Sequence, residues 1–216
     1  VRGVQKRIRS DTNAAEATTP NGLTSFNSDG FTVGTEEDVN TNNENFASWN
    51  WKANGQGSSN TDGSINTTYT SANTTSGFSI IKWTGTGSNG TIGHGLEIAP
   101  ELVFYKTLGT GGYYTYAKHA LGSNGASGKV VIGFLENTAA WTNDTSSFQS
   151  TDPSSTLLYI GGGANLSGAN IAYCFASITG FSKIGSYIGN GNADGTFVYT
   201  GFKPAFIMAK KTSSAG

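Results

Sequence analysis

Charged residues are scarce in this chain: its 216 residues include 13 Lys and Arg and 14 Asp and Glu, for a formal net charge of −1. A protein that binds nucleic acid through phosphates needs clustered, excess Lys and Arg, so nucleic acid is not an expected partner. One basic cluster is interpreted as a solvated strand edge, because charges there discourage edge-to-edge pairing. It comprises Arg2, Lys6, Arg7 and Arg9.

Cysteine and long apolar runs are also scarce. With a single cysteine, Cys174, the chain cannot form an internal disulfide framework or a multi-cysteine zinc site. Two histidines, His94 and His119, are too few for a histidine-based metal site, and we expect neither metal nor cofactor. No stretch approaches the ~18 apolar residues of a membrane span, which argues against membrane insertion.

Small and polar residues dominate what is present. The sequence contains 31 Gly, 28 Thr, 24 Ser and 20 Asn. Thr favours strands, whereas Gly and Asn supply the positive φ angles that tight turns require. With 12 Phe, 9 Tyr and 4 Trp, the chain can also form a core. This composition predicts an all-β fold of short strands joined by turns.

An internal repeat organises the chain. The run GFSIIKWTGTGSNG at 77–90 recurs as GFSKIGSYIGNGNADG at 180–195, and each copy continues to a proline and an apolar run. A second pairing aligns 46–51 with 170–175, and a third aligns 31–34 with 158–161. Such self-similarity is the signature of repeated modules.

The repeat divides the chain into four parts. We expect the closing part of a first β module at 1–51, a linker rich in Gly, Ser, Thr and Asn at 52–76, a complete module at 77–175, and the opening part of a further module at 176–216. The chain is therefore expected to be cut from, or continue into, a longer polypeptide. A less favoured alternative is that the two partial modules complement each other, within a chain or between neighbouring copies.

Short apolar or alternating runs predict the strands of the complete module. Six or seven strands in about a hundred residues indicate a sandwich, either a jelly roll or lectin-like. In the last strand, Ile171, Tyr173 and Phe175 share one face. We expect the two aromatic residues of this face, Tyr173 and Phe175, to form cores, with Trp49 and Trp51 at the matching positions of the first unit. Cys174 lies on the small-residue face and is expected to be a packing thiol. The predicted strands are 78–84, 102–106, 113–118, 129–135, 156–160 and 170–176.

No motif indicates catalysis. Gly85, Gly87 and Gly90 match G-x-G-x-x-G, but no helical pattern follows, so we interpret them as a hairpin turn. We expect His94 to be a turn histidine hydrogen-bonded to backbone. A glycosidase needs two facing carboxylates, and the repeat replaces Glu101 by Ala205, which disfavours a repeated catalytic unit. We therefore expect no catalytic residues and no enzyme activity.

Sugar binding is harder to dismiss, because sandwiches bind glycans with exposed aromatic rings and loop amides or carboxylates. Tyr113 follows a Gly-rich turn, and Trp141, Asn143 and Asp144 lie in a polar stretch. These four residues are the candidate glycan contacts. The alternative is that Trp141 caps the end of the sandwich and that Tyr114 and Tyr116 belong to the core.

Long strings of the sequence resemble a known family. They include VRGVQKRIRS, NGLTSFNSDGFTVG, FASWNWKANG, TIGHGLEIAP and IAYCFASITGFSKIGSYIGNGNADGTFVYTGFKPAFIMAKKT. Together they are similar to the repeated, uncharacterised β domain of virion structural proteins of marine tailed bacteriophages, such as tail fibre or tail proteins. Glu97 and Glu101 depart from this pattern, in which a Gly-Val-Ala-Pro-Lys type of run is commoner.

The resemblance implies a structural role on the virion surface. Repeated modules of a tail fibre or appendage would attach to the host by many weak contacts, which together give avidity. Expected partners are other virion proteins, further copies of the chain as a homo-oligomer, and a glycan of the host cell surface. The alternatives are a capsid decoration or cement protein and a glycan-binding tailspike module.

Overall fold

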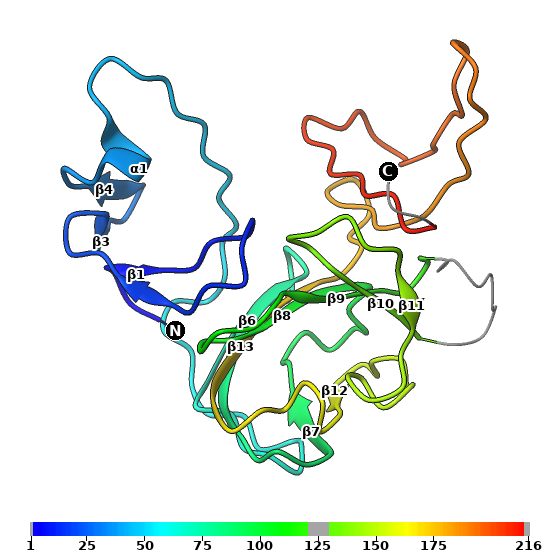
Figure 1. Ribbon diagram of the computed structural model, residues 1–216, viewed down its shortest axis with the longest axis horizontal. Helices are drawn as coiled ribbons and strands as arrows, with labels where there is room; N and C mark the ends of the chain where they lie inside the picture. The colour runs from blue at the N-terminus through cyan, green and yellow to red at the C-terminus, as the bar shows by residue number, and fades with distance from the viewer. Residues whose placement is uncertain (1, 121–129, 214–216) are drawn as a thin grey trace.

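The chain folds as an all-β protein around one antiparallel sheet, in a computed structural model that describes residues 2–120 and 130–213 (Figure 1). The seven strands of the sheet follow the order β11-β10-β9-β8-β13-β6-β5. They are β5 (Tyr69–Asn73), β6 (Phe78–Gly85), β8 (Leu102–Thr107), β9 (Tyr114–Ala117), β10 (Val131–Phe134), β11 (Thr142–Asn143) and β13 (Gly168–Phe175).

A second layer covers one face of this sheet. It contains β7 (Gly90–Gly93) paired with β12 (Leu157–Ile160), together with loops that supply Leu96, Phe148 and Ala164 to the core. The architecture is therefore sandwich-like. The six strands predicted between residues 78 and 176 are all present, because each combines an apolar run with flanking turn residues.

The core lies on the small-residue face of β13, which contradicts the prediction that its aromatic side chains are internal. Ala172 and Cys174 are fully buried on that face, whereas Tyr173 and Phe175 are only half-buried on the outer face, where Ile171 is fully buried. The neighbouring strands contribute the large side chains of the core. Trp83 of β6 and Tyr105 of β8 are fully buried, with ring centroids 5.4 Å apart. Small residues on the central strand leave room for these rings.

Cys174 is the packing thiol that the sequence predicts. It is fully buried between Ser79 of β6 and Val103 of β8 in the strand register. Burial raises the pKa of the Cys174 thiol to about 12, because a thiolate would lose its hydration there. The thiol is therefore unreactive at neutral pH.

The predicted linker at 52–76 is not separate from the sheet. Its residues 69–73 form β5, which pairs with β6 and supplies the buried Ser71. A further bridge joins Ser58 to Thr70. Composition alone missed this edge strand, because Tyr69, Thr70 and Ser71 lie within a run of small polar residues typical of linkers.

Two flanks lie on the outer side of the sheet, away from β7 and β12 (Figure 1). The N-terminal flank (residues 2–51) contains two small antiparallel pairs and a single helical turn. The C-terminal flank (176–213) contains no strand among its described residues, apart from one bridge between Ile178 and Ser182. The elements of the N-terminal flank are β1 (Lys6–Arg7), β2 (Ala17–Thr18), β3 (Leu23–Phe26), β4 (Phe31–Val33) and α1 (Glu37–Asn40).

Candidate functional site

The predicted glycan contact Trp141 is an internal residue. Only 3% of it is exposed, and its indole packs so closely over Gly133 of β10 that a Cβ at residue 133 would overlap the ring. Its backbone N–H donates to the carbonyl of Thr212, at 2.9 Å, so the C-terminal flank meets the module at this residue. Stacking on a sugar requires an exposed ring face, which Trp141 does not offer in this arrangement.

Tyr113 lies just before β9 and is also buried, with 5% of it exposed. Its backbone N–H donates to Glu136, at 3.0 Å, and the Lys106 ammonium lies 5.1 Å from the centre of its ring. Lys106 in turn donates to the carbonyl of Gly111. Burial raises the pKa of the Tyr113 hydroxyl, so the ring is a neutral structural anchor for the Gly-rich turn before it.

Asn143 and Asp144 belong to the sheet edge and the turn that follows it. Asn143 is half-buried in β11, opposite Val131 of β10. The Asp144 carboxylate is buried and accepts backbone N–H groups of the following turn. The donors are Ser146 at 3.3 Å, Ser147 at 2.7 Å, Phe148 at 2.9 Å and Ser150 at 2.9 Å. This carboxylate organises the turn and has no free face for a ligand.

We expect Asp144→Asn to lower the free energy of unfolding by about 2–3 kcal/mol, because the amide replaces an acceptor oxygen with a donor that faces backbone N–H groups. The matched control is Asp29→Asn, at an exposed turn, which should change stability by no more than about 0.5 kcal/mol. Urea denaturation followed by circular dichroism measures both. Equal stability of the two variants would refute the structural role of Asp144.

The Gly-rich motif at 85–90 and the carboxylates of the module also have structural roles. Gly85 and Gly90 end β6 and begin β7, and four residues of turn separate them, so no helix receives a phosphate. This turn passes from the large sheet to the second layer, so the predicted hairpin is wrong, although the predicted turn is confirmed. Of the carboxylates, Glu136 accepts from Tyr113, and Asp152 accepts from the Tyr116 hydroxyl at 2.8 Å.

His94 is the backbone-bonded turn histidine that the sequence predicts. Its ring is fully buried; Nδ1 accepts the N–H of Leu96 at 3.2 Å, and Nε2 lies 3.1 Å from the carbonyl of Ser154. These partners define a neutral imidazole that accepts at Nδ1 and donates at Nε2. Burial lowers the pKa of His94 below its usual 6.5, despite the opposing effect of the Ser154 carbonyl.

This lowered pKa predicts a pH dependence of stability. The unfolded chain binds a proton at His94 more readily than the folded one, so the stability is fully present above about pH 6.5 and declines as the pH falls below it. We expect denaturation midpoints to fall between pH 7 and pH 5, and the fall to be smaller in His94→Asn. An equal fall in both proteins would show that His94 is not responsible.

The basic cluster is neutralised within the N-terminal flank. Arg2 pairs with Glu16 at 2.9 Å and donates to the Tyr173 hydroxyl of β13 at 2.9 Å. Arg7 and Arg9 both pair with Asp38 of α1. These ion pairs leave little uncompensated positive charge, and the bond from Arg2 to Tyr173 fastens the flank to the sheet.

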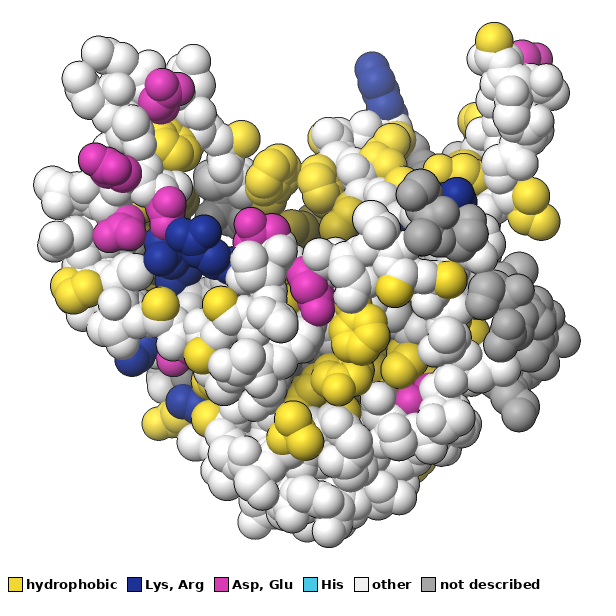
Figure 2. Space-filling model, in the orientation of Figure 1, with side chains coloured by type: hydrophobic (Ala, Val, Ile, Leu, Met, Phe, Trp, Pro, Cys, Tyr) yellow, Lys and Arg dark blue, Asp and Glu magenta, His cyan; other side chains and the backbone are white. Residues whose placement is uncertain are grey.

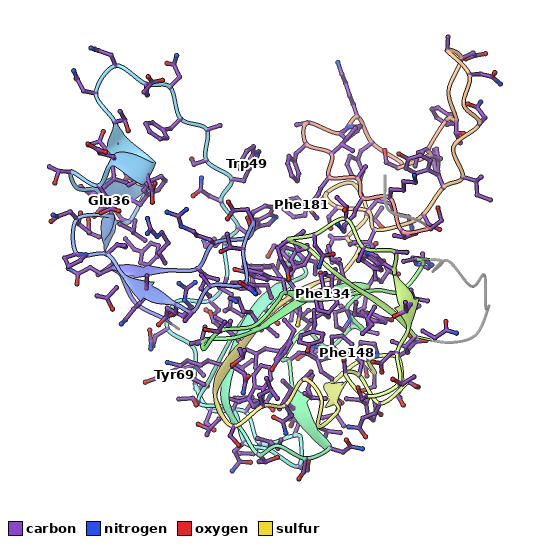
Figure 3. All side chains as sticks on the ribbon, viewed as in Figure 1. Glu36, Trp49, Tyr69, Phe134, Phe148 and Phe181 are labelled. Atoms are coloured by element: carbon purple, nitrogen blue, oxygen red, sulfur yellow. The ribbon has the colours of Figure 1, made fainter. Side chains whose placement is uncertain are left out.

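The main candidate surface is a set of exposed aromatic side chains on the two flanks. Trp49, Trp51 and Phe206 are exposed, which contradicts the prediction that Trp49 and Trp51 are core residues. The Phe206 ring lies 5.8 Å from that of Trp49 and 6.3 Å from that of Trp51. Trp51 also packs edge-on against Phe175, at 5.8 Å. Figure 2 shows the hydrophobic side chains gathered between the flanks, and Figure 3 shows Trp49 on the side that faces the C-terminal flank.

This surface can bind apolar or aromatic groups, but the described residues offer little else. Among residues 2–120 and 130–213, no cluster of three or more His, Cys, Asp or Glu could hold a metal ion. No helix in the same ranges is long and apolar enough to cross a membrane. Exposed aromatic side chains gathered in this way are typical of an interaction face.

Comparison with known proteins identifies the family. The model of the family described as "Domain of unknown function (DUF7483)" matches residues 1–216, and the chain belongs to this family. We find no significant match among curated proteins or among solved structures.

Proposed function

We propose that this protein is a non-catalytic structural component of a phage virion, most simply a tail fibre or appendage that displays repeated β modules to the host surface. The observation that supports this proposal is an all-β module whose flanks repeat parts of its sequence and expose large aromatic side chains. Inside the module, the Asp144 carboxylate and the His94 ring bond to backbone groups of the module itself. The virion assignment itself follows from the resemblance of the sequence strings.

Attachment by such a protein depends on repetition. The exposed aromatic side chains lie on the flanks, whereas the module exposes only Ile98 and Leu166 among the large apolar residues of its described part. Individually weak contacts, repeated along a fibre, raise the overall affinity through effective concentration without a deep pocket. A host-surface glycan is the proposed ligand class, and its contacts would come from exposed loops instead of the buried Tyr113 and Trp141.

Localisation on intact particles tests this proposal most directly. Antibodies raised against the purified chain, detected with gold in electron micrographs, should label the distal ends of tail appendages. Label over the head would instead establish the capsid decoration role. Absence of the protein from particles would overturn the virion assignment.

Competition tests attachment separately from location. The purified chain, added in excess, should reduce the adsorption rate of the phage to its host, because it occupies the receptor. Heat-unfolded chain at the same concentration is the control and should have no effect. Unchanged adsorption with the folded chain would contradict a receptor-binding role.

A further inference from the structure

Backbone hydrogen bonds join the N-terminal flank to the turn that follows β8. The N–H of Glu16 donates to the carbonyl of Leu108 at 2.9 Å. The N–H of Gly111 donates to the carbonyl of Asn13, also at 2.9 Å. The two segments therefore run antiparallel, as neighbouring strands of a ladder do. Because the contact uses backbone groups, it does not depend on which side chains occupy these positions.

The donor of this contact recurs in the module. β1 and β2 pair in the same register as β10 and β11, with a constant shift of 125 positions. This shift takes Glu16, which directly precedes β2, to Trp141, which directly precedes β11. The N–H of Trp141 donates to the carbonyl of Thr212 in the C-terminal flank, again at 2.9 Å. The module thus reaches the unit after it from the position that the N-terminal flank uses to reach the module.

The acceptor of the contact recurs as well. In the sequence repeat Pro100 matches Pro204, and the eight residues that follow each proline, ELVFYKTL and AFIMAKKT, align without a gap. Leu108 therefore matches Thr212. Donor and acceptor are equivalent at the two junctions, the first between the N-terminal flank and the module and the second between the module and the C-terminal flank.

The connections between the units are too different to impose this contact. The 25 residues 52–76 cross the first junction, whereas four residues, 176–179, cross the second. Four residues keep the positions on either side of them within about 18 Å, and a connection of 25 can extend several times as far. The same hydrogen bond across both connections indicates that the contact belongs to the surfaces of the units.

Side chains at the donor position differ between the junctions. Glu16 forms an ion pair with Arg2 at 2.9 Å, whereas Trp141 is buried over Gly133. A carboxylate and an indole have no chemistry in common that could select the same acceptor. The shared feature is the backbone N–H, which both residues present at the start of an edge strand.

A lysine accompanies the acceptor at both junctions. Lys106, two residues before Leu108, is fully buried and donates to the carbonyl of Gly111, which holds the turn after β8. Lys210 occupies the matching place in the C-terminal flank and donates to the carbonyl of Asn137 in the module. The lysine therefore stabilises the acceptor turn at the first junction and bridges the two units at the second.

We propose that the turn after β8 is a docking site at which each repeat unit of this chain receives the closing half of the unit before it. The segment that docks lies just before the edge strand of that closing half. It comprises residues 13–16 in the N-terminal flank, and its counterpart in the module, 138–141, docks on Thr212.

Docking of this kind fixes successive units relative to one another. Units that contact their neighbours through one recurring interface form a regular array, as in solenoid proteins, instead of separate domains on flexible linkers. The rings of Trp49 and Phe206 lie 5.8 Å apart, so the two flanks also touch, on the outer side of the sheet (Figure 1). The inference concerns the relation between units and holds whether or not the protein belongs to a virion.

The distance between two spin labels tests the docking directly. Ser28→Cys in the N-terminal flank and Ser155→Cys in the module place the labels at exposed bends, and the native Cys174 is buried and does not react. Pulsed electron spin resonance should give one narrow distribution of distances for this labelled chain. A broad distribution would show that the flank moves independently of the module and would overturn the proposal.

Removing the backbone donor should release the flank. In the labelled chain, Glu16→Pro deletes the N–H that bonds to Leu108, and we expect the distribution to become at least about twofold wider. Glu16→Ala is the matched control, because it removes the carboxylate and keeps the N–H; its distribution should stay narrow. An unchanged width in Glu16→Pro, or equal widening in both variants, would show that the backbone contact does not dock the units.

Hydrogen exchange in the unmodified chain tests both junctions without a variant. The amides of Glu16 and Trp141 should exchange on the order of tenfold more slowly than the amide of Ser28, because the contact holds each of them. Their rates should not change with protein concentration, since the contact lies within one chain. Protection of Glu16 without protection of Trp141 would show that the contact does not recur, and would refute the docking site.

Discussion

Replacing Trp83 by alanine should lower the free energy of unfolding by about 3–5 kcal/mol, the largest loss that we expect from a single core substitution. The indole is fully buried against Tyr105, and its Nε1–H donates to the Asn165 side chain at 3.0 Å. Alanine would leave a cavity and an asparagine oxygen without its donor. Denaturation followed by far-ultraviolet circular dichroism measures the change.

Trp49→Ala is the matched control, since 62% of this tryptophan is exposed. The module should unfold at nearly the same denaturant concentration with and without the Trp49 ring. If Trp49→Ala were as destabilising as Trp83→Ala, the core would extend to the outer face of the sheet, and our assignment of the core face would be wrong.

Gly161→Ala should destabilise the protein by about 3 kcal/mol, at the upper end of the usual cost of overpacking. The chain at Gly161 passes so close to the carbonyl oxygen of Ser146 that a Cβ there would overlap it, and this oxygen belongs to backbone that cannot rotate away. The N–H of Gly161 also donates to the Ser147 carbonyl. A shift that relieves the overlap would therefore break this hydrogen bond.

Alanine substitutions at two further glycines serve as comparisons for Gly161→Ala. Gly34 is the repeat counterpart, and a Cβ there would lie 2.5 Å from the carbonyl oxygen of Asn21, so Gly34→Ala should disturb the N-terminal flank in the same way. Gly30 has nothing within 4 Å of such a Cβ, and Gly30→Ala should be close to neutral. Tolerance of alanine at Gly161 would contradict the close approach of the Ser146 carbonyl oxygen to this residue.

The strands of the module could be predicted because local signals coincide there. The run at 78–84 alternates Ser79, Ile81 and Trp83 on one face with Phe78, Ile80 and Lys82 on the other, and glycines lie on both sides of it. The edge strand β5 could not be found in this way. Its small polar residues are held by pairing with β6, which is a contact that composition does not reveal.

The candidate glycan site shows a second limit of local signals. Trp141 lies among polar residues, and such a tryptophan is expected at a surface. Its indole packs over Gly133, eight positions earlier, and its backbone N–H bonds to Thr212, about seventy positions later. The sequence gives no sign that β10 and the C-terminal flank meet around this indole.

The sequence by itself determined the all-β class, the repeat, the inert thiol at Cys174 and the turn role of His94, because composition, periodicity and spacing are local properties of a chain. Only the tertiary structure decided which face of β13 is the core. Period two places Ala172 and Cys174 opposite Tyr173 and Phe175, but it does not say which side receives the second layer. That depends on the volume of Trp83 and Tyr105 on the neighbouring strands, which fill the space that the small residues leave.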